Sequence, residues 1–244
     1  MLEFGEVDRW VVVTGGTRGL GRAITTRVLA DTDLNVISIS RSLNTNMERE
    51  HGERLVQVSY DLLDTAGISA MIAEVSKGRQ LVGLINNAGI GANSVLMTQH
   101  ESEINNIICC NLTAPILLSK YISRAMIRGR HGGKIINIAS VVAKTGYNGL
   151  ATYAATKAGL IGFTKSLARE LGRAKIAVSV VSPGFMETDM TSGIEDKLEV
   201  IKRRSPVNEF PALDDVVDVV MLLLTADHSR YTGAEYLVDA GNSA

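Results

Sequence analysis

The chain has 244 residues, a formal net charge of −1 and 45% hydrophobic residues. This composition suits a globular protein with a sizeable core and excludes a disordered chain, while 25 basic and 26 acidic residues give no reason to expect nucleic acid or an anionic membrane as partner. Apolar runs far below the ~20 residues of a membrane span, an acidic N-terminus unlike a signal peptide, and two adjacent cysteines predict a cytoplasmic protein.

Short β-branched runs alternate with longer helical stretches along the whole chain. The sequence predicts strands at 10–13, 36–40, 55–58, 81–85, 134–138, 176–181 and 235–238. It predicts helices at 19–30, 68–75, 101–126, 151–171 and 213–224. Apolar strands separated by helices are typical of a parallel sheet that is covered on both faces. We therefore expect a single α/β domain over 1–244, a doubly wound parallel sheet in three layers. The long strandless segment 184–211 is predicted to be a substrate lid.

A glycine-rich turn follows the first predicted strand directly and opens the first helix. It contains Gly15, Gly19 and Gly21 within Thr14-Gly-Gly-Thr-Arg-Gly-Leu-Gly21. Glycines at such a turn let the backbone approach a pyrophosphate, which then sits at the helix N-terminus. The alternative is a plain strand-to-helix turn, because a glycine-rich turn alone is a weak signal.

Two arginines indicate which dinucleotide would bind. Arg41 stands at the end of the second strand, twenty residues after Gly21, where an NAD-binding fold normally has an acidic residue for the ribose 2′-hydroxyl. Arg18 lies inside the glycine turn. Two guanidinium groups suit a 2′-phosphate, because arginine offers forked donors to phosphate oxygens. The pair therefore favours NADP, unless both side chains are ordinary solvated surface arginines.

Ser140, Tyr153 and Lys157 form the strongest chemical pattern. Tyr153 and Lys157 are four residues apart on a predicted helix, so that both lie on one face. Ser140 follows a predicted strand, and ligands of a parallel sheet bind at the carboxyl ends of its strands. The four histidines, in contrast, have no second ligand at metal spacing, so we expect no metal site.

At this point the sequence resembles the short-chain dehydrogenase/reductase family over essentially its whole length, which implies a Rossmann-type fold. The resemblance is carried by the 14–21 turn, Asp61, Asn86-Asn-Ala-Gly89, Asn111, the set of Ser140, Tyr153 and Lys157, Pro183-Gly184 and Thr188. The stretches 153–170 and 183–191 look most like 3-oxoacyl-[acyl-carrier-protein] reductases. Together the motifs are specific for the family and less specific for the substrate.

The resemblance implies roles for individual residues. Catalytic residues would be Asn111, Ser140, Tyr153 and Lys157. The NADP site would be formed by Gly15, Thr17, Arg18, Gly19, Leu20, Gly21, Arg41, Asp61, Leu62, Asn87, Ala88, Gly89, Tyr153, Lys157, Pro183, Gly184, Met186 and Thr188. Tyr153 would donate a proton to the carbonyl oxygen, and Lys157 would lower the pKa of the phenol and hold the nicotinamide ribose. Ser140 would orient the substrate oxygen.

Asn111 allows a further prediction. Pro115 lies four residues later and has no N–H, so the carbonyl of residue 111 loses its helical hydrogen bond. In the family that carbonyl holds a water that connects the lysine to solvent, at a helix kink. The alternative is that Pro115 merely bends a long helix.

The expected function is reduction of a small-molecule carbonyl by NADPH, most specifically of a 3-oxoacyl thioester on an acyl carrier protein. Alternatives are an alcohol or sugar dehydrogenase and a non-catalytic nucleotide-binding sensor or scaffold. Arg130, Arg173 and Lys175 are candidates for carrier docking beside the mouth of the site, or are ordinary helix-end cations. The resemblance also implies a homotetramer. Val207-Asn208 and Asp239-Ala240-Gly241 depart from the family pattern and weaken the substrate assignment.

Overall fold

The computed structural model describes residues 8–91, 94–186, 202–203, 205–227 and 230–244. Its strands form one parallel sheet in the order β3-β2-β1-β4-β5-β6-β7. Their bounds are β1 Arg9–Thr14, β2 Asn35–Ser40, β3 Leu55–Ser59, β4 Gln80–Asn86, β5 Gly133–Ile138, β6 Ile176–Pro183 and β7 Glu235–Val238. The prediction of a doubly wound parallel sheet is therefore confirmed.

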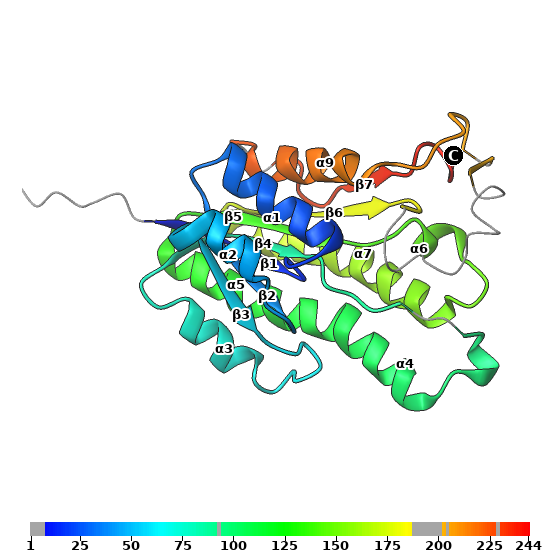
Figure 1. Cartoon of the computed structure of the whole chain (residues 1–244), viewed down its shortest axis with the longest axis horizontal. Helices are drawn as coiled ribbons and strands as arrows, with labels where there is room; N and C mark the ends of the chain where they lie inside the picture. Colours follow the sequence, from blue (N-terminus) through cyan, green and yellow to red (C-terminus); the bar gives the residue numbers. More distant parts are fainter. Residues whose placement is uncertain (1–7, 92–93, 187–201, 204, 228–229) are drawn as a thin grey trace, which may run out of the picture.

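Helices cover both faces of the sheet. They are α1 Gly19–Asp31, α2 Thr45–His51, α3 Ile68–Val75, α4 Glu101–Ile108, α5 Ala114–Gly129, α6 Val142–Thr145, α7 Ala151–Leu171 and α9 Leu213–Thr225. The core on one face contains residues of α3, α5 and α7, and the core on the other contains residues of α1, α2 and α9. Figure 1 shows the resulting three layers, with α1 and α9 on one side of the sheet and α3, α5 and α7 on the other.

The strand order reverses at β1, and this reversal positions the site. β1 pairs with β2 on one side and with β4 on the other. The connections that leave β1 and β4 therefore diverge to opposite faces and open a crevice at the carboxyl ends of the two strands. In open α/β sheets ligands bind in such a crevice.

The long predicted helix 101–126 is interrupted, so this prediction was wrong in detail. α4 ends at Ile108, a π-helical turn spans Cys109–Thr113, and α5 begins at Ala114. In this turn the Ala114 N–H donates to the carbonyl of Cys109, five residues earlier. The irregularity expected from Pro115 is thus present, but it takes the form of an inserted residue that begins before the proline. π-helical turns of this kind occur often at functional sites.

The sequence periodicity missed several short elements. α2 and α6 were not predicted, and neither were the 3₁₀ turns Gly52–Arg54, Leu96–Thr98 and Gly172–Ala174. Elements of three to seven residues are too short to show a helical period. Within the described residues, no helix combines the length and the apolar character needed to cross a bilayer. The predicted lid 184–211 lies partly outside the described residues, and the single domain and the lid both stay predictions.

Candidate active site

A cleft of about 1200 Å³ opens at the carboxyl edge of the sheet. It is lined by most of the residues that the sequence singled out: Gly15, Thr17, Arg18, Gly19, Leu20, Gly21, Arg41, Asp61, Leu62, Asn87, Ala88, Gly89, Ser140, Tyr153, Lys157, Pro183, Gly184 and Met186. Asn111 lies behind the lining and is fully buried. Thr188 lies outside the described residues. The fold therefore brings together residues that are up to 171 positions apart, from Gly15 to Met186.

The glycine turn between β1 and α1 forms a close cradle. Gly15 has a φ of +69°, in the left-handed region that favours glycine. A Cβ on Gly21 would stand 2.1 Å from the carbonyl oxygen of Gly15, so no side chain fits there. Arg18 occupies the N-cap of α1, and no side-chain hydrogen bond caps that helix end. The first N–H groups of α1 can therefore serve a bound anion, which fits a pyrophosphate.

Thr14 joins the two strands at the base of the crevice. Its hydroxyl oxygen accepts hydrogen bonds from the N–H groups of Asn87 and Ala88, both at 3.0 Å. The Asn87 side chain donates to the carbonyl of Thr14 at 2.9 Å. The end of β4 is thereby held against the glycine turn, which fixes the distance between the two walls of the cleft. The sequence analysis included Thr14 in the turn but assigned it no role.

Arg18, Arg41 and Asp61 lie together at the end of the cleft formed by the turns after β1, β2 and β3. All three are exposed. The Asp61 carboxylate accepts a hydrogen bond from the Leu63 N–H at 3.0 Å, which fixes its orientation. Two arginines near this end of the cleft fit an anionic group on the adenosine ribose.

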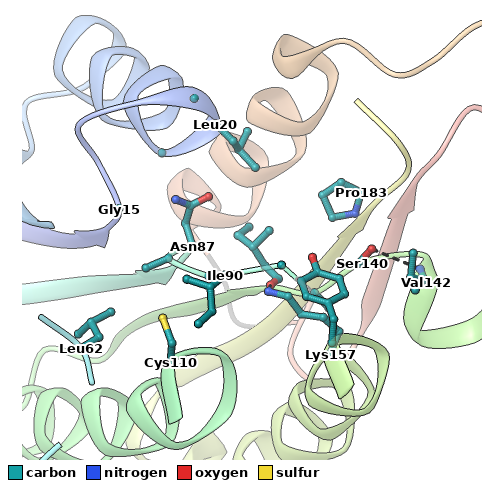
Figure 2. A pocket seen from close by; sticks show the side chains of 18 of the residues that line it. Gly15, Leu20, Leu62, Asn87, Ile90, Cys110, Ser140, Val142, Lys157 and Pro183 are labelled. Atoms are coloured by element: carbon teal, nitrogen blue, oxygen red, sulfur yellow. Dashed lines mark hydrogen bonds between the residues drawn. The ribbon is translucent and has the colours of Figure 1, made fainter. Parts of the chain in front are cut away.

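Ser140, Tyr153 and Lys157 converge on the middle of the cleft from the end of β5 and the first two turns of α7. The Lys157 ammonium donates to the carbonyl of Ile138 at 2.7 Å and lies 5.6 Å from the centre of the Tyr153 ring. The Val142 N–H donates to the hydroxyl oxygen of Ser140 at 3.3 Å, the dashed contact in Figure 2. Ser140 and Lys157 are only 8% and 3% exposed, so this polar set lies in a largely dry part of the cleft.

Burial sets the proton affinities of the two ionisable groups. Burial raises the pKa of Tyr153 to about 12, although its hydrogen bond with Ser140 acts in the opposite direction. Burial lowers the pKa of Lys157 to about 8, and Cys110 acts in the opposite direction. The role expected for Lys157, to favour the phenolate of Tyr153, stays a prediction. With a pKa of about 12, the Tyr153 phenol is protonated at neutral pH.

Asn111 acts through its side chain as well as its backbone position. Its amide oxygen accepts from the Ile90 N–H and its amide nitrogen donates to the Ile90 carbonyl, both at 2.8 Å. The π-helical turn thus holds the segment that follows Asn87-Ala88-Gly89. A Cβ on Gly89 would lie 3.3 Å from the Asn111 side chain and 3.6 Å from the Lys157 ammonium, so this segment packs directly on the lysine. The sequence predicted a role for the Asn111 carbonyl and did not predict this clamp.

The cleft also contains residues that sequence reasoning missed. Cys110 and Val142 are two of them, and Figure 2 shows Cys110 near the predicted Leu62 and Val142 beside the predicted Ser140. Beyond Ser140, the rings of Tyr147 and Phe185 face each other at the wall of the cleft. Phe185 could have been found because it lies between Gly184 and Met186, which were predicted. Tyr147 carries no sequence signal.

The basic residues considered for carrier docking lie elsewhere. Arg130 follows α5, and Arg173 and Lys175 directly precede β6. Gly133 at the start of β5 donates its N–H to the Lys175 carbonyl at 3.2 Å. These residues therefore sit at the amino edge of the sheet, whereas the cleft opens at the carboxyl edge. The expectation that they flank the mouth of the cleft is wrong within one chain, because a helix that returns from the cleft ends at the opposite edge.

Comparison with known proteins agrees with the geometry. The family model described as short chain dehydrogenase matches residues 9–199. The 3-oxoacyl-[acyl-carrier-protein] reductase of Escherichia coli K12 is 38% identical over 94% of this chain and 95% of its own length. A 4-hydroxyisoleucine dehydrogenase solved with NADH superposes with a TM-score of 0.90 at 26% identity, covering 97% of this chain and 99% of that one.

A protein assigned as an NAD(P)-dependent gluconate 5-dehydrogenase from Beutenbergia cavernae, with NADP at low occupancy, superposes equally well. Its TM-score is 0.90 at 27% identity, covering 96% of each chain. The family match, the parallel sheet and the cleft at its carboxyl edge agree with the resemblance drawn from the motifs. The chain belongs to the short-chain dehydrogenase/reductase family of nicotinamide-dependent oxidoreductases.

Proposed function

We propose that this protein is a cytoplasmic carbonyl reductase that uses NADPH and acts on 3-oxoacyl thioesters, to give the 3-hydroxyacyl products. The observation that carries the proposal is the convergence of Ser140, Tyr153 and Lys157 beside the glycine cradle, in one cleft. The likeness to 3-oxoacyl-[acyl-carrier-protein] reductases supports the substrate class.

The choice of NADPH is supported by the arginines at the adenosine end. Arg18 and Arg41 bind the 2′-phosphate, and Asp61 binds the adenine amine. Asn87 and Gly89 line the adenosine side, and the backbone of the 15–21 turn holds the pyrophosphate. Thr188 binds the carboxamide. When bound, the reduced nicotinamide supplies the hydride.

The chain itself handles the substrate oxygen and the proton. The Ser140 hydroxyl donates a hydrogen bond to the carbonyl oxygen and fixes its position. The Tyr153 phenol donates its proton to the same oxygen as the carbonyl carbon becomes tetrahedral. Lys157 stabilises the resulting phenolate by its charge and holds the nicotinamide ribose. The Asn111 carbonyl holds a water that connects Lys157 with solvent. Through this water a proton from solvent returns to the Tyr153 phenolate.

The deciding experiment measures NADPH oxidation spectrophotometrically with a panel of 3-oxoacyl thioesters, simple ketones and sugars, for the native protein and Tyr153→Phe. The native protein should turn over the thioesters fastest. Tyr153→Phe should lose about 10²–10⁴-fold in turnover while it still binds NADPH, because only the proton donor is removed. Activity above about a tenth of native in Tyr153→Phe would exclude the phenol as the acid.

The same panel separates the alternatives. With alcohols added and NADP⁺ in place of NADPH, oxidation of alcohols or sugars with little reduction of ketones in the first assay would identify a dehydrogenase. Binding of NADPH without any turnover would identify a nucleotide-binding sensor or scaffold. The proposal includes a carrier protein that bears the acyl substrate and a tetramer as the active form. Activity on carrier-bound and on small soluble thioesters, together with sedimentation of the native protein, tests both.

A further inference from the structure

Charge is distributed unevenly along the cleft. The charged residues among its described lining are Arg18, Arg41, Asp61 and Lys157. The first three lie at the adenosine end, and Lys157 is engaged with the Ile138 carbonyl in the middle. The described lining on the side of Tyr153 away from these three residues contains no charged side chain. We call this part the substrate lobe, and it consists of Gly91, Val95, Asn106, Val141, Val142, Tyr147, Asn148, Gly149, Leu150, Phe185 and Met186.

One charged side chain close to the substrate lobe in sequence is engaged in an ion pair. Lys144 stands three residues before Tyr147, but its ammonium pairs with the Glu235 carboxylate at 3.2 Å. The other oxygen of Glu235 accepts a hydrogen bond from the Ser182 hydroxyl at 2.8 Å.

Tyr147 and Phe185 form the aromatic wall of this lobe. Their ring centroids are 5.2 Å apart with the planes inclined at 57°, a favourable arrangement for two aromatic rings. The two residues come from different connections, since Tyr147 lies between α6 and α7 and Phe185 follows β6. The pair therefore joins the two connections that border the lobe.

The backbone holds both rings in place. The Val141 N–H donates to the Pro183 carbonyl at 2.9 Å, which ties the connection after β5 to the end of β6. Gly184 donates to the Val238 carbonyl at 2.8 Å, and a Cβ there would stand 2.8 Å from the Asp239 backbone. Gly146, just before Tyr147, has a φ of +66°. The aromatic wall is thus set by backbone contacts on both sides.

We propose that the substrate lobe selects ketones whose groups beside the reacting carbonyl are uncharged and apolar, and that Tyr147 and Phe185 are its specificity-determining residues. This inference rests on the proposed carbonyl reductase activity. A carboxylate next to the carbonyl loses water on entering the lobe and finds no cation among its described residues, which is costly. A thioester presents no charge there, and its apolar chain gains contact with the two rings.

The test compares two ketones of equal size that differ in charge, 3-oxobutanamide and 3-oxobutanoate. Calorimetric titration of the full chain with NADP⁺ present gives their dissociation constants, and NADPH oxidation gives kcat/KM. The amide should bind at least about thirtyfold more tightly, because an unpaired carboxylate is costly even in a cleft that opens to solvent. Asn148→Arg, which adds a cation to the lobe, should shift the selectivity about tenfold toward the acid. Asn105→Arg, an exposed position outside the cleft, should leave the selectivity unchanged.

The aromatic pair is tested with ethyl 3-oxohexanoate, a neutral ketone with an apolar chain. Tyr147→Ala and Phe185→Ala should each raise KM about tenfold with a smaller effect on kcat, because a half-buried ring is lost from the wall. Tyr147→Phe should recover most of the loss, since the ring rather than the hydroxyl makes the contact. A loss in kcat with unchanged KM would assign the pair to support of Ser140 and overturn its role in specificity.

The outcomes separate this inference from the proposed function. Equal binding of the amide and the acid overturns the inference whatever the turnover. Binding of neither compound at millimolar concentration also overturns it, because the lobe is then not a ketone site. Selective binding of the amide with no NADPH oxidation supports the inference and refutes the reductase proposal.

Discussion

Burial of the Lys157 ammonium should make the stability of this protein depend on pH in a defined way. The side chain is 3% exposed and its pKa is lowered to about 8, whereas an unfolded lysine titrates near 10.4. Between these values the unfolded chain binds more protons than the folded chain, so the free energy of unfolding rises with pH. Below about pH 8 both states are protonated and the full cost of the buried charge remains. The substitution Lys157→Met removes this dependence.

The size of the effect follows from the two pKa values. Integrating the proton difference from about pH 7 to about pH 9.5 gives a gain of about 2 kcal/mol for the native chain. The stability difference between Lys157→Met and the native chain should therefore change by about 2 kcal/mol over that range. Tyr153 is present in both proteins, so the ionisation of its phenol, with a pKa of about 12, largely cancels.

Urea denaturation at fixed protein concentration measures the difference, since any oligomer would make the apparent stability depend on concentration. Lys165→Met is the matched control, because Lys165 is exposed on the same helix. Its stability should track that of the native chain at every pH. A gap between the native chain and Lys157→Met that stays constant within about 0.5 kcal/mol would refute the assignment of a desolvated, depressed lysine.

Three further substitutions test other parts of the structure. Arg41→Asp should weaken NADPH about ten- to a hundredfold and spare NADH, because a charged hydrogen bond contributes about 1.5–3 kcal/mol; equal affinity of the native protein for both dinucleotides in a fluorescence titration would contradict this. Gly21→Ala puts a Cβ 2.1 Å from the Gly15 carbonyl and should weaken the binding of either dinucleotide at least about tenfold, whereas Gly162→Ala, with open space around it, is the control. Ala240→Gly relieves a φ of +54° and should raise the free energy of unfolding by up to about 1 kcal/mol in urea; a clear loss would show that Ala240 is not strained.

Local chemistry made much of the fold predictable. All seven strands and the long helix Ala151–Leu171 were found because continuous Val and Ile runs and a helical period act over short distances. The glycine turn was equally readable, since its function needs a backbone without side chains. The irregular helix around Asn111 was foreseen only in part, because a missing N–H at Pro115 predicts a disturbance but not the π-helical form it takes.

The site shows a similar division. Ser140, Tyr153 and Lys157 were predicted as a set, and the structure adds that Lys157 bonds to the carbonyl of Ile138 rather than to a side chain. The direction of the Tyr153 pKa could not be read from spacing. Burial raises this pKa and the hydrogen bond with Ser140 lowers it, and only the packing around the ring shows that burial is the larger cause.

The sequence by itself determined the parallel sheet and the glycine-rich turn after β1, because each depends on neighbours within one turn or one strand. The tertiary structure alone decided which distant residues share the cleft. In the structure the ring of Tyr147 contacts the ring of Phe185, which follows a different strand. Arg130 and Arg173 lie at the amino edge of the sheet, opposite the cleft. The physical reason is that strand direction and order fix the edge at which each connection emerges, and no local pattern encodes that.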